Sequence, residues 1–296
     1  MPARLFNNPY LLLALAGLCW SGNHVIGRAI AGQVPPLSLS AVRWLLPMAV
    51  LLPFAKPHLE RDWPLIKRNW RILAFLGGTG GALFGALQYF GLQHTTAINA
   101  SVLNSLSPVL IVAAGALLFR DHLSATRVLG IAVSLAGVLV VVTRLDPDIV
   151  SSLSLNAGDL LITCNMAVWG IYSACLRLRP SIHWVSLIYI VAGMSTVATM
   201  PLLVWEHLRG FTFQPNLVTA LAILYVSFFP SLIAFVAWNR GVELIGPNRA
   251  SPFLHMVVLY SAILATIFLG ERILPYHVLG FFLILGGVAL AARRAR

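Results

Sequence analysis

The chain has 296 residues, of which 59% are hydrophobic and 10% are charged, with a formal net charge of +11 at pH 7. Soluble domains carry about 25% charged residues, so this composition excludes a water-soluble protein, and a mean hydropathy of +0.86 indicates an integral membrane protein. The basic residues lie in short loops between apolar runs instead of on one water-facing surface, which excludes nucleic acid as a partner.

Ten apolar runs are long enough to cross a bilayer at about 20 residues each. They cover residues 9–30, 36–54, 71–91, 96–118, 125–142, 156–176, 182–204, 217–238, 247–269 and 273–292. The connections between them are mostly very short, which leaves no room for a domain outside the membrane. The first run begins like a signal peptide, but it continues past Ala14 to a full spanning length, so we expect it to be retained.

The distribution of Lys and Arg predicts the orientation of these runs. If both chain termini are cytoplasmic, fifteen basic residues fall in cytoplasmic segments and only three, Arg144, Arg209 and Arg272, fall in external ones. Cytoplasmic loops of membrane proteins are enriched in Lys and Arg. We therefore expect a multi-pass protein with both termini in the cytoplasm.

The sequence also matches itself at a shift of 150 residues, which pairs 86–142 with 236–292 without a gap. Nine pairs are identical, and six of them fall within the eleven positions 128–138. The repeat unit holds five spans, an odd number, so the second copy must enter the membrane in the opposite sense. Inverted repeats place a binding site between the halves and work by alternating access. We expect residues 1–148 and 149–296 to form the two repeats.

Three parts of the chain resemble EamA-type transporters of the drug/metabolite transporter superfamily. They are the opening CWSGNHVIGR (19–28) with Pro36 and Arg43 after it, the run 86–142, and the run 238–292 with its GPNRAS and LGER. Within the superfamily the chain is most similar to bacterial aromatic amino-acid exporters of the YddG type. The resemblance implies an all-α polytopic protein of the bacterial inner membrane, with ten transmembrane helices as two inverted five-helix repeats around a central cavity.

Polar side chains within the spans are expected to face the interior of the bundle, because they are costly in lipid. Helical spacing places Trp20, Asn23 and His24 in one stripe of the first span. The repeat superposes polar and aromatic residues of the two halves, as a shared central site requires. We expect this substrate-binding cavity to be lined by Trp20, Asn23, His24, Gln88, Tyr89, Ser101, Asn104, Ser105, Trp169, Tyr172, Trp238, Asn239 and His255.

These residue types suit a zwitterion with an apolar side chain. Trp and Tyr combine apolar faces with one hydrogen-bonding tip, and Asn, Gln, Ser and His can bind amino and carboxylate groups. Asn104 and Ser105 could instead only bridge neighbouring helices. We expect a structural or gating role for Arg43, Pro108 and Pro252. For Arg43 the alternatives are reaching to the headgroups and binding a substrate carboxylate.

Residues near the ends of the spans carry a different signal. All nine acidic residues lie in loops or close to a span end, which argues against a carrier of cationic drugs and for a neutral or zwitterionic substrate. If protons are coupled to transport, His24 or His255 would carry them. Tryptophans at span ends usually anchor at the membrane interface, and we expect that role for Trp44, Trp63, Trp70, Trp184 and Trp205.

The predicted function is a transporter that exports amino acids, aromatic and other neutral ones, by alternating access. A carrier of another metabolite in the same fold, such as a phosphorylated compound, is the alternative, although it would need several cations in the cavity. An intramembrane transferase is a third hypothesis, but no nucleophile or acid/base cluster supports an enzyme. We expect no cofactor and no metal site, a small molecule and the lipid bilayer as partners, and a monomer.

Overall fold

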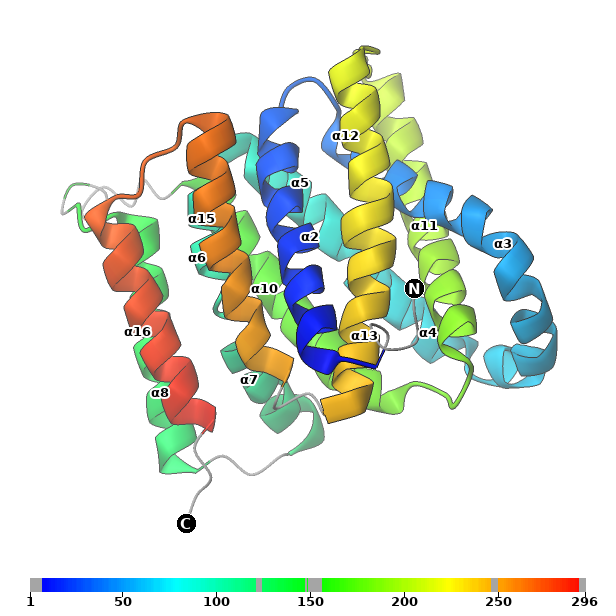
Figure 1. The fold of residues 1–296 in the computed structure, drawn as a ribbon, viewed down its shortest axis with the longest axis horizontal. Coiled ribbons are helices and arrows are strands. Elements are labelled where there is room, and N and C mark those ends of the chain that lie inside the picture. The colour runs from blue at the N-terminus through cyan, green and yellow to red at the C-terminus, as the bar shows by residue number, and fades with distance from the viewer. Residues whose placement is uncertain (1–6, 121–123, 147, 149–155, 246–249, 293–296) are drawn as a thin grey trace.

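The computed structural model describes residues 7–120, 124–146, 148, 156–245 and 250–292, which form helices and contain no strand. Figure 1 shows the helices side by side in one bundle. Two short segments are π-helical and two are 3-10 turns. In chain order the elements are α2 (Pro9–Ala29), α3 (Pro36–Arg68), α4 (Trp70–Gly77), η1 (Gly78–Leu83), α5 (Phe84–His94), α6 (Ala97–Asn104), α7 (Ser107–Phe119), α8 (Ala125–Thr143), α10 (Ala157–Cys175), η2 (Leu176–Leu178), α11 (Trp184–Leu208), α12 (Leu217–Phe228), η3 (Phe229–Ile233), α13 (Ala234–Ile245), η4 (Ser251–Leu254), α15 (His255–Leu269) and α16 (Pro275–Ala292).

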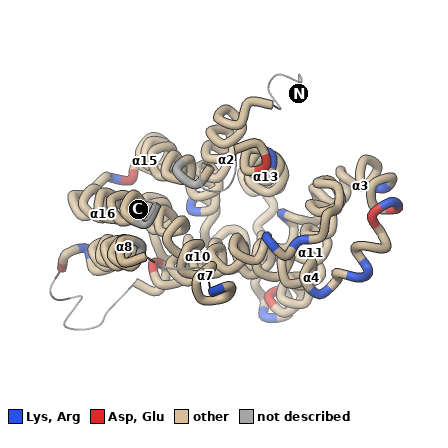
Figure 2. The backbone as a smooth tube through the Cα atoms, turned by 90° about the horizontal axis from the view of Figure 1, so that it is seen from below, with Lys and Arg blue, Asp and Glu red and all other residues tan. Residues whose placement is uncertain are grey.

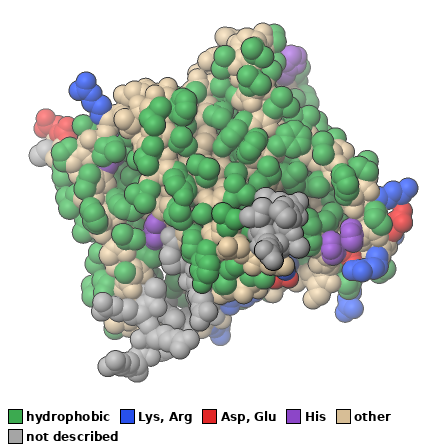
Figure 3. Space-filling model, in the orientation of Figure 1, with side chains coloured by type: hydrophobic (Ala, Val, Ile, Leu, Met, Phe, Trp, Pro, Cys, Tyr) green, Lys and Arg blue, Asp and Glu red, His purple; other side chains and the backbone are tan. Residues whose placement is uncertain are grey.

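Length and hydropathy identify six segments that can each cross a membrane: α2, α3, α4 to α5, α10 to η2, α11, and α12 to α13. The pair α6 and α7, bent by 42°, makes a seventh if it is counted as one span. Three shorter apolar helices, Val128–Thr143, His255–Leu269 and Pro275–Leu290, lie in the other predicted runs. The visible surface is largely hydrophobic (Figure 3). The chain is therefore an all-helical multi-pass membrane protein in the part that the structure describes.

The two ends of the bundle differ in charge. We call the end where α2 begins the basic end, because it carries Lys56, Arg61, Lys67, Arg68, Arg71, Arg177, Arg179 and Arg240. Viewed from below, Lys and Arg gather around α3 and α4 (Figure 2). We call the other end, where α2 finishes and α12 begins, the opposite end.

Helix α3 extends to Arg68, well beyond residue 54, where its apolar run ends. The prediction stopped where hydropathy falls. Helix formation, however, depends on hydrogen bonds within the segment and not on hydropathy. The polar continuation is useful to the fold because it carries Asp62 to the start of α11.

Helices α3 and α11 run antiparallel, and each is capped by a carboxylate of the other. At the opposite end, Glu206 of α11 accepts hydrogen bonds from the backbone N–H groups of Leu37 and Ser38, at 3.2 and 2.7 Å. At the basic end, Asp62 of α3 accepts from the N–H of His183, which precedes α11, at 2.8 Å. The first N–H groups of a helix lack intrahelical partners and favour negative charge. The two carboxylates therefore fasten both ends of this pair.

The helices are interrupted at positions that the 150-residue shift relates. The π-helical segments η1 and η3 begin at Gly78 and Phe229, within one residue of that shift. The bend after α6 falls at Ser105, and the junction of η4 with α15 falls at His255, 150 residues later. The third and fourth segments of each half are thus irregular in the same places.

The pair α8 and α16 packs through small residues that the same shift relates (Figure 1). A Cβ atom added to Gly137 would meet the backbone of Gly280, and one added to Gly287 would meet the backbone of Gly130. The Ser134 hydroxyl donates to the carbonyl of Ile284 at 3.2 Å. Close approach of two helix backbones needs such small residues.

The capping of α3 can be tested with Glu206→Gln. The amide keeps one acceptor but loses the charge and the second oxygen. We therefore expect the free energy of unfolding to fall by roughly 1–2 kcal/mol, which would appear as a lower thermal unfolding midpoint in detergent. Glu60→Gln, which changes an exposed carboxylate of α3, is the matched control. Equal midpoints for the two variants would contradict the capping role.

Candidate functional site: a central cavity

A narrow cavity lies where both halves of the chain meet. Its volume of about 30 Å³ has room for one or two water molecules, so it is too small for an amino acid in this conformation. Residues from α2, α3, α5, α6, α10, α13 and η4 form its wall: Trp20, Asn23, His24, Arg43, Phe84, Gln88, Asn104, Trp169, Phe235 and Leu254.

Aromatic rings make up one side of this cavity. The rings of Trp20 and Trp169 meet edge to face at 6.0 Å between centroids, and Phe235 meets Trp20 at 6.3 Å and 90°. Phe84 lies 5.1 Å from Trp169. Trp20 is oriented by a hydrogen bond from its indole nitrogen to the carbonyl of Pro230, 3.2 Å away in the π-helical segment η3. These rings offer a surface for an apolar or aromatic group.

Arg43 forms the polar counterpart of the aromatic wall. It is 1% exposed, and its Nε donates to the Ser231 hydroxyl of η3 at 2.8 Å. Its Nη1 donates to the Tyr89 hydroxyl at 3.2 Å, and that hydroxyl donates to Asn23 Oδ1 at 2.8 Å. The guanidinium also lies over the rings of Trp44 and Tyr89, at 5.4 and 5.5 Å. The expectation that Trp44 anchors at the membrane interface is wrong, since it is 1% exposed.

Gln88 and His24 add further polar groups to the lining, and Asn165 contacts Gln88 from outside it. Asn165 donates to Gln88 Oε1 at 3.0 Å, which leaves Gln88 Nε2 and Asn165 Oδ1 without a partner among the described residues. His24 Nδ1 lies 3.2 Å from the Ser261 hydroxyl. Gln88, which lines the cavity, therefore has an amide donor without a partner among the described residues.

Lining residues come in pairs that the repeat relates. Asn104 and Leu254 are separated by 150 residues, and Trp20 and Trp169 by 149. Both pairs face the same small space. The cavity therefore lies between corresponding surfaces of the two halves.

The structure brings together six of the residues predicted to line a cavity, and their contact with a substrate stays a prediction. These are Trp20, Asn23, His24, Gln88, Asn104 and Trp169. Three more of the predicted residues, Tyr89, Tyr172 and Trp238, do not line the cavity but contact residues that do. Tyr89 contacts Arg43, Tyr172 packs on Trp169 at 5.1 Å, and Trp238 packs on Trp20 at 5.5 Å.

Four predicted residues lie elsewhere. Ser101 and Ser105 donate to carbonyls of their own segment, as serines that only shape a helix do. Asn239 donates to the Phe235 carbonyl. His255 is buried near Phe281, and neither of its ring nitrogens has a partner among the described residues.

The two prolines predicted for structure or gating lie beside the helix interruptions. Pro108 occupies the first turn of α7, where its missing N–H is not needed. Pro252 belongs to η4, and its side chain lies outside the described residues. Sequence reasoning missed Phe235 and Leu254, because an apolar side chain in an apolar helix gives no signal of which way it faces.

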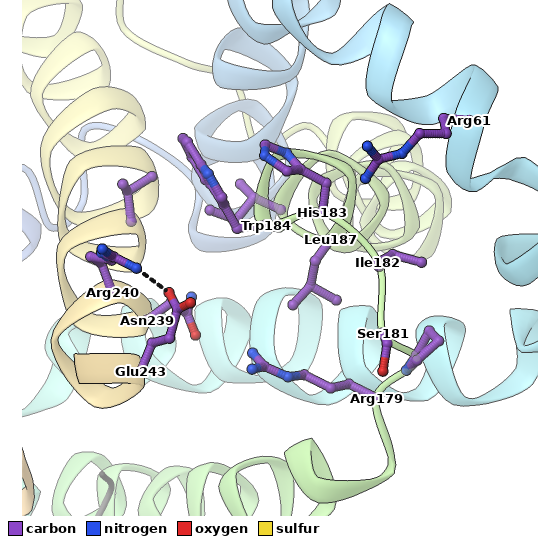
Figure 4. Close-up of a pocket in the computed structure, with 13 residues that line it drawn as sticks. Arg61, Arg179, Ser181, Ile182, His183, Trp184, Leu187, Asn239, Arg240 and Glu243 are labelled. Carbon is purple, nitrogen blue, oxygen red and sulfur yellow. Dashed lines mark hydrogen bonds and ion pairs between the residues drawn. The ribbon is translucent and has the colours of Figure 1, made fainter. Parts of the chain in front are cut away.

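A larger space, the vestibule, opens at the basic end with a volume of about 600 Å³ (Figure 4). It is lined by Arg61, residues 179–184, Leu187, Ile188, Val236, Asn239, Arg240 and Glu243. Arg240 and Glu243 pair at 2.9 Å and face Arg179 across it (Figure 4). Asn239 lies one helical turn, about 6 Å, beyond Phe235 of the central cavity.

At the opposite end, buried hydrogen bonds connect α6 to α10 and α16. The Asp159 carboxylate accepts from the Thr95 hydroxyl and from Asn99 Nδ2, the latter at 3.1 Å to each oxygen. His277 Nδ1 accepts from the N–H of Leu274 at 2.9 Å, so its Nε2 carries the proton and donates to Asn99 Oδ1 at 2.6 Å. Asn99 thus connects the first half of the chain to two helices of the second.

Comparison with known proteins identifies the family. The model of the EamA-like transporter family matches residues 7–143 and again 156–293. An uncharacterized transporter of Bacillus subtilis, YyaM, is 25% identical over 96% of this chain and 93% of its own length. One of Archaeoglobus fulgidus is 27% identical over 96% of this chain and 97% of its own.

Two further matches extend this comparison. A probable terminal-alkyne amino-acid exporter of Streptantibioticus cattleyicolor is 26% identical over 77% of this chain and 74% of its own length. A crystal structure with a TM-score of 0.65 covers 96% of this chain and 97% of its own at 23% identity, which supports the fold alone. With two matches that together span nearly its whole length, the chain belongs to the EamA-like transporter family.

Proposed function

We propose that the protein exports amino acids, aromatic and other neutral ones, across the bacterial inner membrane by alternating access. In this proposal residues 1–148 and 149–296 form two inverted halves of five spans each, the division falling beside residues 149–155, outside the described part. The basic end lies in the cytoplasm. The transported molecule passes through the central cavity.

The observation that carries the proposal is the pairing of cavity residues across the repeat. Trp20 and Trp169 face one space from the two halves, as a site between inverted repeats requires. Interrupted helices support the same reading, because the breaks lie at repeat-related positions beside that space. Binding sites of such carriers are commonly formed by discontinuous helices.

The two ends of the bundle differ in how far they are open, and this difference supports a carrier that is open toward the cytoplasm in this conformation. A vestibule of about 600 Å³ opens at the basic end. At the opposite end Asn99 bonds to Asp159 and His277. For release on that side, these bonds would have to break and the central cavity would have to widen.

The aromatic wall favours substrates with apolar side chains, and one relative is named as a probable exporter of an amino acid. A phosphorylated or nucleotide-linked metabolite is the alternative in the same fold. It would call for several cations in the cavity, where Arg43 is the one among the described lining residues.

Counterflow tests the substrate class. Proteoliposomes preloaded with unlabelled amino acid are expected to take up labelled phenylalanine, tryptophan or leucine, and not labelled arginine or a sugar phosphate. The measurement is accumulated label against empty liposomes. Uptake of the anionic metabolite, with none for any amino acid, would favour the alternative carrier.

Topology can be tested with single cysteines in a variant without Cys19, Cys164 and Cys175. A cysteine at Glu60, exposed at the basic end, is expected to react with an impermeant maleimide only after cells are permeabilised. A cysteine at Phe213, 40% exposed at the opposite end, is expected to react in intact cells. The reverse pattern would invert the proposed orientation.

A further inference from the structure

Arg43 is a buried positive charge within the bundle. It lies seven residues into α3, about 10 Å from the start of that helix, and its side chain is 1% exposed while lining the central cavity. Arginine stays protonated under all physiological conditions. A charge at this depth is costly unless it is paired.

The described residues do not neutralise this charge. Its two hydrogen bonds go to uncharged hydroxyl groups, those of Ser231 and Tyr89. Among the described residues, Nη2 has no hydrogen-bond partner, and no carboxylate lies within ion-pair distance of the guanidinium. One edge of the group is therefore free for a ligand.

The buried carboxylates of the described chain, Asp62, Asp159 and Glu206, and the half-buried Glu271 already have other hydrogen-bond partners. Asp62 and Glu206 cap α11 and α3, and Asp159 accepts from Asn99. Glu271 accepts from the N–H groups of Ala97 and Ile98 at the start of α6, at 2.9 Å each. None of them can turn toward Arg43 without leaving a helix start uncapped or breaking the hydrogen bonds between Asn99 and Asp159 at the opposite end.

The guanidinium is also held in a fixed orientation. Ser231 in η3 fixes Nε, and the rings of Trp44 and Tyr89 lie against the group. A planar guanidinium held in this way can bind a carboxylate through parallel hydrogen bonds. The aromatic rings of Trp20, Trp169 and Phe235 line the same cavity, where an apolar group of the ligand would fit.

We propose that Arg43 is the anchor for the carboxylate of the transported molecule. The substrates are accordingly monocarboxylates with an apolar or aromatic group. The cavity presents no acidic side chain among its described lining residues, so it has no charged partner for an ammonium group. The α-amino group is then tolerated but not required, and an amine without a carboxylate is rejected. This inference rests on the proposed export function and specifies its substrate.

The test is binding to purified protein in nanodiscs, followed by tryptophan fluorescence and by the thermal unfolding midpoint. Three ligands separate the groups: L-phenylalanine, 3-phenylpropionate without the amino group, and phenethylamine without the carboxylate. We expect the wild-type protein to bind the two carboxylates with Kd values within about threefold of each other. Phenethylamine should bind at least tenfold more weakly.

Variants of the anchor give a second readout. Arg43→Gln is expected to weaken the binding of both carboxylate ligands at least tenfold. Arg43→Lys keeps the positive charge but loses the paired N–H donors of the guanidinium, so it should weaken their binding less. Arg71→Gln, at an exposed arginine of α4, is the matched control and should leave Kd unchanged. Should Arg43→Gln fail to fold, the three ligands on the wild-type protein still decide the question.

Several outcomes would overturn the anchor. They are equal binding of phenethylamine and phenylalanine, or an unchanged Kd for 3-phenylpropionate in Arg43→Gln. If amino acids still exchange in wild-type proteoliposomes under those outcomes, the export function stands and only the anchor is lost. If no carboxylate binds and no amino acid exchanges, both proposals are rejected together.

Discussion

Inside a membrane, the polar groups of the backbone have to find their partners within the protein. At the starts of α3, α6 and α11 this chain meets that requirement with carboxylates from other segments. Asp62, Glu206 and Glu271 each cap another helix. Because these acids cap helices, they are not available as counter-ions for Arg43 in the central cavity. Arg43 is left with hydroxyl partners and a free edge.

The interruptions of the helices place this charge beside the aromatic wall. A π-helical turn changes which residues face the interior and often marks a functional site. The segment η3 provides both the Ser231 hydroxyl for Arg43 and the Pro230 carbonyl for Trp20. Its counterpart η1 has glycines that leave space for Tyr172 and Ser195. Corresponding irregularities in the two halves thus build one cavity with a polar and an apolar side.

The difference between the two ends follows from which contacts are made. At the opposite end Asn99 satisfies both Asp159 and His277 with directional hydrogen bonds. At the basic end the vestibule separates the loop 179–184 from α13. Under the alternating access that we propose, the two ends would exchange these states. A packed interface favours two discrete arrangements over a gradual deformation.

Hydropathy determined the membrane class and the apolar runs, the match of the sequence to itself determined the internal repeat, and helical periodicity placed Trp20, Asn23 and His24 on an inward face. Those features depend on local composition and on the cost of polar groups in lipid. Only the tertiary structure decided that Phe84, Phe235 and Leu254 line the cavity, that Trp44 is buried and that Asn239 faces the vestibule. Lipid is as apolar as a helix interface, so packing, and not hydropathy, decides which apolar side chain faces inward.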